Sequence, residues 1–215
     1  MKIRNINDLQ DLIDRDLSWR KKELTAVNSN IKQARKFAKN TGIRSGITLL
    51  YAHWEGSVKN IATYYLSYVA YQGLPYNQLR KNFLALSVKE DLKLFDSTNK
   101  ATLHNDIVRS LFEKYEEKSK IPCDNIIKTS SNLNSEIFKE IMTTIGLDYS
   151  QYQSTFILID EVLLNMRNHI AHGERLDSLS LDEDRFNEIY KKITHLISIF
   201  AIQVSNAAST KQYMV

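Results

Sequence analysis

The segment GITLLYAHWEGSVKNIATYYLSYVAY, residues 46–71, carries the strongest structural signal in this sequence. Its apolar side chains recur at the 100° per residue of an α-helix and form one continuous stripe. The members of this stripe are Ile47, Leu50, Tyr51, Trp54, Val58, Ile61, Tyr65, Tyr68 and Val69. Gly73 and Pro75 follow and end the helix. Because this helix is longer than most globular helices, we expect it to be the central strut of a helical bundle.

Helical signals continue on both sides of this strut. Residues 6–38 predict one long polar helix, and the segment KNTGIRSG, residues 39–46, is expected to break it because two glycines lie close together. Further helices are expected over 77–95, over 101–118, over 133–146, from about 150 to Gly173, and from Ser180 onward.

The composition favours an all-α chain. It has 6 Gly and 2 Pro among 215 residues, too few for the many turns of a β-sandwich or barrel. The single cysteine, Cys123, excludes an internal disulfide and a cysteine-rich zinc site. No run reaches the roughly 18 apolar residues of a membrane span, and the first residues lack the apolar core of a secretory signal. We therefore expect one all-α domain over residues 1–215, cytoplasmic and without a membrane contact.

Positive charge is concentrated near the N-terminus. Residues 1–44 carry 11 Lys and Arg against 5 Asp and Glu, whereas the rest of the chain carries 18 against 20. Such a segment attracts polyanions such as RNA, DNA or an acidic partner, although a merely solvated helix face has the same pattern. The candidate RNA-binding residues are Arg20, Lys21, Lys22, Lys32, Arg35 and Lys36.

A cluster of polar and ionisable residues, RNHIAHGE (167–174), lies at the end of an otherwise apolar helix. One polar line runs along this helix at spacings of 4, 3 and 4, formed by Glu161, Asn165, Asn168 and His172. Arg167 projects about 140° away from His172, from a face that would normally enter the core. An arginine there must find an anion or a set of acceptors, because burying it unpaired is very unfavourable.

The chemistry of two residues in this cluster suits the cleavage of a phosphodiester. Arg167 offers a permanent charge and a bidentate fork for phosphate. His172 supplies an imidazole, a group that proteins use to transfer protons. Because RNA carries its own nucleophile in the 2′-hydroxyl, a protein that binds the phosphate and moves protons needs no metal.

Other interpretations of the cluster stay open. A C-cap histidine beside an arginine in a core-edge salt bridge is a purely structural arrangement. His169, His172 and Glu174 are also possible metal ligands, but no further ligand stands at a recognisable spacing. A metal-dependent DNA nuclease is disfavoured because the sequence has no carboxylate cluster.

These residues resemble the signature of a known family. Arg167-Asn168-x-x-x-His172, on a late helix of an all-α chain, is similar to the Arg-x4–6-His signature of HEPN domains. The run Tyr51-Ala52-His53-Trp54-Glu55-Gly56 looks like the branch of stand-alone prokaryotic HEPN-like nucleases linked to anti-phage defence and toxin–antitoxin loci. The resemblance covers most of the chain as helix order, and its specific motifs cover these two stretches.

The resemblance implies a HEPN-like helical bundle and a homodimeric endoribonuclease that needs no metal or other cofactor. Two copies of the signature would face each other in one composite site, with Arg167, His172 and Asn168 as the catalytic residues. Apart from the resemblance, Glu55 at the edge of the apolar stripe is either a partner that orients Arg167 or an ordinary charge at the core boundary, and His169 is the second supporting candidate. RNA would be the substrate, and an antitoxin or other inhibitor protein a partner. The alternative is a non-catalytic HEPN-type module that binds a nucleotide or a partner protein.

Overall fold

The structure, a computed structural model, describes residues 2–130, 132–174 and 181–215. Within these residues every regular element is a helix, and β pairing is limited to two isolated bridges, so the all-α fold is confirmed. The α-helices are α1 (Ile6–Gln33), α2 (Lys36–Gln72), α3 (Lys81–Ser87), α4 (Lys89–Asp96), α5 (Ala101–Glu116), α6 (Ser135–Thr144), α7 (Asn165–Ala171) and α8 (Glu183–Ser209). The other helical segments are the 3-10 helices η1 (Tyr76–Gln78) and η2 (Ser150–Thr155) and the π-helix η3 (Leu158–Leu164). None of the helices described combines the length and apolar character that a membrane crossing requires.

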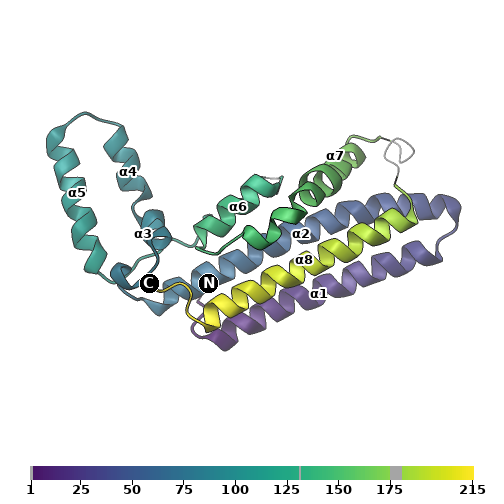
Figure 1. Cartoon of the computed structure of the whole chain (residues 1–215), viewed down its shortest axis with the longest axis horizontal. Coiled ribbons are helices and arrows are strands. Elements are labelled where there is room, and N and C mark those ends of the chain that lie inside the picture. The colour runs from purple at the N-terminus through teal and green to yellow at the C-terminus, as the bar shows by residue number, and fades with distance from the viewer. Residues whose placement is uncertain (1, 131, 175–180) are drawn as a thin grey trace.

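Three long helices, α1, α2 and α8, lie side by side along the molecule (Figure 1). The apolar stripe of residues 46–71 faces the interior of this bundle, where Trp54, Val58 and Ile61 are fully buried. The matching row on α8 consists of Phe186, Ile189, Ile193, Ile197, Phe200 and Val204, all buried. The central strut expected from the sequence is therefore confirmed as α2.

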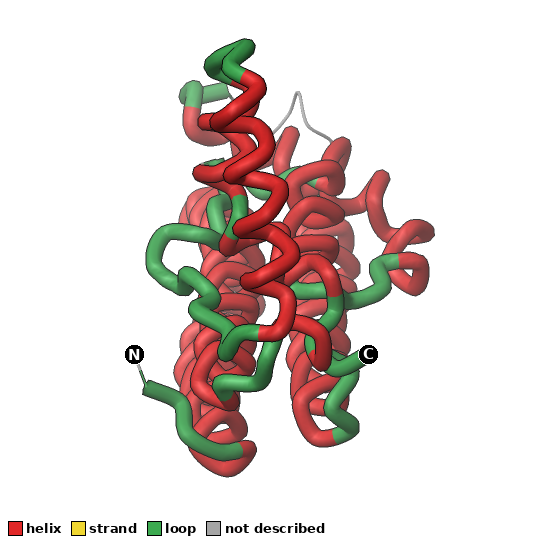
Figure 2. Tube along the Cα trace, turned by 90° about the vertical axis from the view of Figure 1, so that its left-hand side faces the viewer, coloured by secondary structure: helices red, strands yellow, loops and turns green. Residues whose placement is uncertain are grey.

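Shorter helices surround the strut. α6 and α7 lie along one side of α2, whereas α4 and α5 form a hairpin that projects from the other end of the molecule (Figure 1). The view turned by 90° shows this hairpin in front of the long helices (Figure 2). α7, which carries the 167–174 cluster, therefore packs on the bundle and far from the projecting hairpin.

The connection between the first two long helices lies earlier than the sequence indicated. α1 ends at Gln33, and α2 already begins at Lys36. Ala34 and Arg35, between them, adopt extended backbone conformations. The break expected within residues 39–46 is therefore wrong, because that segment forms the first turns of α2.

Close packing of helices explains the two glycines that suggested this break. A Cβ atom on Gly46 would lie 2.6 Å from Cε2 of Phe186 in α8, and one on Gly42 would lie 3.1 Å from Cγ1 of Ile31 in α1. Real Cβ atoms do not approach neighbours as closely as the first distance. The glycines therefore allow α1 and α8 to approach α2, at a small cost in helix propensity.

Two other predicted helices are divided. The helix expected over 77–95 is split into η1, α3 and α4, and the one expected from about 150 to Gly173 into η2, η3 and α7. The helices expected over 101–118 and 133–146 correspond to α5 and α6. Ser180, the expected start of the last helix, lies outside the described residues. α8 is described from Glu183, and the side chain of Asp182 caps it by accepting from the backbone N–H of Arg185 at 2.8 Å.

Candidate active site

α7 carries the 167–174 cluster and follows directly on the π-helix η3. Ile159 and Leu163 of η3 are fully buried and anchor the segment against α2. π-Helical turns are rare and are frequently found at functional sites. Arg167 lies four residues after Leu163 and therefore starts from the side of α7 that faces α2.

The side chain of Arg167 reaches α2 and the loop that precedes α6. Its guanidinium carbon lies 4.2 Å from the centre of the Tyr51 ring, and its Nη2 donates to Oδ1 of Asn132 at 2.5 Å. The Tyr51 hydroxyl accepts from the backbone N–H of Leu133 at 2.6 Å. The expectation that an arginine on this face must find acceptors is therefore confirmed, with an amide oxygen and an aromatic face as the groups that hold it.

Burial and the groups around Tyr51 shift the pKa of its phenol. Burial raises the pKa of Tyr51, and a hydrogen bond from Arg167 opposes this rise. The negative charge of Glu55, one helical turn further along α2, raises the pKa as well. Glu55 thus lies near the group that holds Arg167, and the direct orientation of Arg167 by Glu55 stays a prediction.

His172 is the C-cap residue of α7, and its side chain is exposed. Its backbone N–H donates to the carbonyl of Asn168 at 3.0 Å, and the N–H of Glu174 donates to the carbonyl of His169 at 3.1 Å. Gly173, where the sequence predicted the end of this helix, adopts a left-handed conformation with a φ of 83°. This closed helix end fixes the backbone of His172 and leaves its imidazole accessible.

A second arginine, Arg44 of α2, binds the same helix end. Its Nη2 donates to the carbonyl of Ile170 at 3.3 Å, and its Nη1 donates to the carbonyl of Glu174. A cation at this position stabilises the terminus, because the last carbonyls of a helix carry partial negative charge. Arg44 counted toward the basic segment in the sequence, but in the structure it supports the backbone beside His172.

His169 forms an ion-pair contact across the helix end. Its Nδ1 lies 2.7 Å from Oε2 of Glu174, and both side chains are partly exposed. These are two of the three groups considered as metal ligands, and here they contact each other. Within residues 2–130, 132–174 and 181–215, no group of three His, Cys, Asp or Glu side chains is arranged so that it could hold a metal ion. The supporting role of His169 in catalysis stays a prediction.

The catalytic candidates share one helix end but have different orientations. Arg167 faces α2, whereas His172, five residues later and about 140° around the helix, faces solvent. Asn168 is half-buried on the polar line predicted from the sequence, and the other members of that line, Glu161, Asn165 and His172, are exposed. The polar line is therefore confirmed as a surface feature of η3 and α7.

Arg20 differs from the exposed cation that the sequence predicted. Its side chain is 5% exposed, and its Nε and Nη2 donate to the two carboxylate oxygens of Asp16 at 2.6 and 3.0 Å. Its Nη1 lies 3.3 Å from Nδ1 of His53, and a Cβ atom on Gly56 would lie 2.8 Å from that same Nη1. The expected exposure of Arg20 is wrong, because its charge is paired with Asp16 inside the α1–α2 interface. Gly56, in the middle of α2, leaves room for this guanidinium because it has no Cβ atom.

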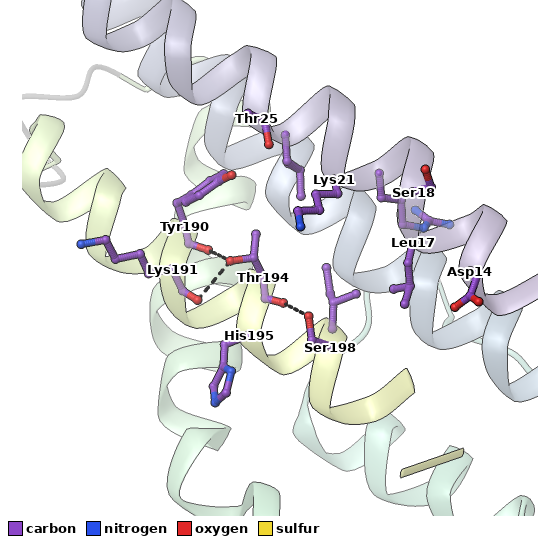
Figure 3. Close-up of a pocket in the computed structure, with 13 residues that line it drawn as sticks. Asp14, Leu17, Ser18, Lys21, Thr25, Tyr190, Lys191, Thr194, His195 and Ser198 are labelled. Carbon is purple, nitrogen blue, oxygen red and sulfur yellow. Dashed lines mark hydrogen bonds between the residues drawn. The ribbon is translucent and has the colours of Figure 1, made fainter. Parts of the chain in front are cut away.

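The other basic candidates are accessible. Their side chains are exposed on α1, in the α1–α2 connection and at the start of α2, and they are Lys21, Lys22, Lys32, Arg35 and Lys36. Lys21 lines a groove of about 710 Å³ between α1 and α8, and the α8 residues that line it include Lys191 and His195 (Figure 3). Contact of these five residues with RNA stays a prediction.

No motif in the sequence indicated that Tyr51 and Asn132 contact Arg167. Tyr51 was assigned to the core stripe, and its hydroxyl is the one available signal, because a buried phenol needs a hydrogen-bond partner. Asn132 lies in a loop, 35 residues before Arg167, outside any motif. A lone loop asparagine carries no sequence signal for such a contact.

The profile of one protein family, described as RiboL-PSP-HEPN, matches residues 15–206. The matched region contains all of α2, the loop with Asn132 and the whole of α7, and therefore both Tyr51 and the Arg167–His172 signature. Neither the curated proteins nor the solved structures compared with the chain gave a match. Because the match covers most of the chain and agrees with its all-α bundle, the protein belongs to the RiboL-PSP-HEPN family.

Proposed function

We propose that this protein is a metal-independent endoribonuclease whose active site contains Arg167, His172 and Asn168. One observation carries the proposal: a single helix end presents an accessible imidazole on a fixed C-cap, together with a guanidinium held by Tyr51 and Asn132. These two groups supply proton transfer and phosphate binding. Membership of a HEPN family supports the same reaction class.

The reaction follows from the chemistry of these groups. The imidazole of His172 removes the proton of the ribose 2′-hydroxyl, and the oxygen attacks the adjacent phosphorus. Arg167 stabilises the negative charge that develops on the phosphoryl oxygens, and Asn168 positions the phosphate or the imidazole. The bond to the 5′-oxygen breaks, and that oxygen takes up a proton. The products are a 2′,3′-cyclic phosphate and a 5′-hydroxyl.

A homodimer is the second part of the proposal. The reaction needs one group that accepts a proton and another that donates one. Two copies of the α7 end, facing each other across a two-fold axis, supply both groups in one composite site. We further propose that an antitoxin or other inhibitor protein controls this cytoplasmic activity, because an unregulated ribonuclease harms its host. A toxin or anti-phage defence role fits such control.

One observation favours a second candidate function, a non-catalytic module that binds a nucleotide or a partner protein. The guanidinium of Arg167 is already engaged by Tyr51 and Asn132, as it would be in a structural role. In that case the wild-type protein cleaves no RNA, and the effect of Arg167→Ala is to lower the free energy of unfolding.

Incubation of the purified protein with total tRNA and rRNA tests the proposal. The expected result is cleavage that persists in EDTA, leaves 2′,3′-cyclic phosphate ends and disappears in a folded His172→Ala variant. Cleavage that a chelator abolishes, or products with 3′-hydroxyl ends, would contradict the proposed chemistry. The absence of cleavage by the wild-type dimer would favour the non-catalytic module.

A further inference from the structure

We propose that a polar pocket between α2 and the loop over residues 123–130 binds the ribose–phosphate backbone of single-stranded RNA beside the scissile phosphate. This inference rests on the proposed function and places the part of the substrate that does not react. It concerns a surface that no feature of the sequence indicated.

The pocket is a cavity of about 690 Å³, a size typical of sites that bind small molecules. Its polar lining comes from two walls: Lys59, Thr63 and Tyr64 of α2, and Asn125, Lys128 and Ser130 of the loop. Asn60 of α2 also lines the pocket, but its side-chain amide donates to Oδ1 of Asp16 at 2.8 Å. The mixture of cations, amides and hydroxyls resembles the contacts that proteins make with phosphate and sugar oxygens.

Two lysines give the pocket its charge. Lys59 and Lys128 line it from opposite walls, and both side chains are exposed. Neither is paired with a carboxylate within the part of the chain that the structure describes. Asp124 is the one acidic residue of the described lining, so the pocket is net positive. A phosphodiester between the two ammonium groups would neutralise this charge.

The loop connects the pocket to the candidate active site. Ser130 lines the pocket, and Asn132, two residues later, accepts the hydrogen bond from Arg167. Two residues span at most about 7 Å of extended chain. The next residue, Leu133, donates to the hydroxyl of Tyr51. The wall of the pocket and the support of the guanidinium are therefore parts of the same short segment.

α2 connects the other wall of the pocket to the candidate active site, because it carries both Lys59 and Tyr51. Lys59 follows Tyr51 by eight residues, which is about 12 Å along the helix. This length corresponds to three or four nucleotides at the roughly 3.4 Å spacing of a stacked strand. A strand whose scissile phosphate lies at Arg167 therefore reaches the pocket within a few nucleotides. None of the basic residues predicted on α1 lines this pocket.

The test compares two double variants of the full chain in binding to a short 2′-O-methyl RNA, which lacks the nucleophile and is not cleaved. Lys59→Ala/Lys128→Ala removes both cations of the pocket. Lys81→Ala/Lys89→Ala is the matched control, because it removes two exposed lysines at the starts of α3 and α4. Fluorescence anisotropy at several salt concentrations gives the affinity and its salt dependence.

We expect the pocket variant to raise the Kd about tenfold and the control to bind like wild type. The slope of log K against log salt should become shallower by about 1.4 in the pocket variant, since each phosphate contact on a single strand contributes about 0.7. An unchanged Kd and slope in the pocket variant overturns the inference, and so does a wild-type chain that does not bind the RNA.

The outcome separates this inference from the proposed function. A pocket variant that binds RNA normally, in a protein whose cleavage depends on His172, overturns the pocket alone. A pocket variant with weakened binding, in a protein whose cleavage does not need His172, supports the pocket and contradicts the catalytic assignment.

Discussion

The guanidinium of Arg167 lies over the ring of Tyr51, with its central carbon 4.2 Å from the ring centre. A contact of this kind contributes about 0.5 to 2 kcal/mol, depending on how far it is removed from water. It also fixes the plane of the guanidinium fork, which decides how the fork meets a phosphate. The central helix of the bundle thereby positions the residue proposed to bind the scissile phosphate.

Tyr51 offers a test of this positioning role through two substitutions. Tyr51→Leu removes the aromatic face, and we expect kcat for RNA cleavage to fall by about tenfold or more, because a small displacement of a catalytic group is sufficient for such a loss. Tyr51→Phe keeps the face and should retain most of the activity. It should still lose about 1–3 kcal/mol of stability, since the buried N–H of Leu133 loses its acceptor.

Steady-state kinetics and urea unfolding of both variants measure these effects. A structural role alone predicts that activity follows stability in both. Equal kcat values for the Leu and Phe variants would therefore contradict the positioning role.

The buried pair of Arg20 and Asp16 is predicted to stabilise the fold and not to bind RNA. Asp16→Ala leaves the guanidinium of Arg20 buried without its carboxylate, and we expect a loss of about 3–5 kcal/mol in the free energy of unfolding. The double variant Asp16→Leu/Arg20→Met removes both charges and should lose less than Asp16→Ala. Urea unfolding measures both values. Wild-type stability of Asp16→Ala would show that Arg20 is not held as described.

The stability of the protein should depend on pH through His53. Burial, followed by the neighbouring charge of Arg20, lowers the pKa of His53 below its usual 6.5, although Glu23 opposes the shift. Between the lowered pKa and 6.5 the unfolded chain binds a proton that the folded protein does not, so stability is complete above about pH 6.5 and falls as the pH decreases. Unfolding free energies at pH 7.5 and 5.5 should therefore differ more in wild type than in His53→Gln. A His195→Gln variant, changed at an exposed histidine, should behave like wild type, and identical pH profiles in all three would refute the prediction.

Gly46 tests the helix packing that replaced the expected break. Gly46→Ala places a methyl group 2.6 Å from the Phe186 ring, and we expect it to destabilise the protein by about 1–3 kcal/mol. Gly42→Ala, whose methyl group would lie 3.1 Å from a flexible Ile31 side chain, is the matched control and should be far less harmful. Thermal unfolding compares the two. A higher Tm for Gly46→Ala would indicate that the residue does not lie between two packed helices.

Much of the fold could be predicted from the sequence, because long apolar stripes record which face of a helix is buried. The strut around Trp54 and the rows on α8 are examples. The connection between α1 and α2 could not be predicted from Gly42 and Gly46. Glycine occurs both in turns and where two helices pack closely, and the sequence does not distinguish these two uses. The division of the helix before Gly173 into 3-10, π and α segments also leaves no trace in the apolar pattern.

For the candidate site, the sequence predicted the residues that form a local motif but not their long-range partners. The spacing of Arg167 and His172 is local, and the left-handed Gly173 after them follows from the preference of glycine for that conformation. The partners of Arg167 come from α2 and from a distant loop, and such contacts depend on the packing of the whole chain. Arg20 was predicted at the surface because of its charge, whereas tertiary packing places it in the interior beside Asp16.

The decisive measurement for the proposed active site is the rate at which His172→Ala cleaves a short single-stranded RNA, with His195→Ala as the control at another exposed histidine. We expect folded His172→Ala to cleave at least about a hundredfold more slowly than wild type, whereas His195→Ala should cleave at the wild-type rate. Wild-type cleavage by folded His172→Ala would contradict the assignment of this helix end as the active site.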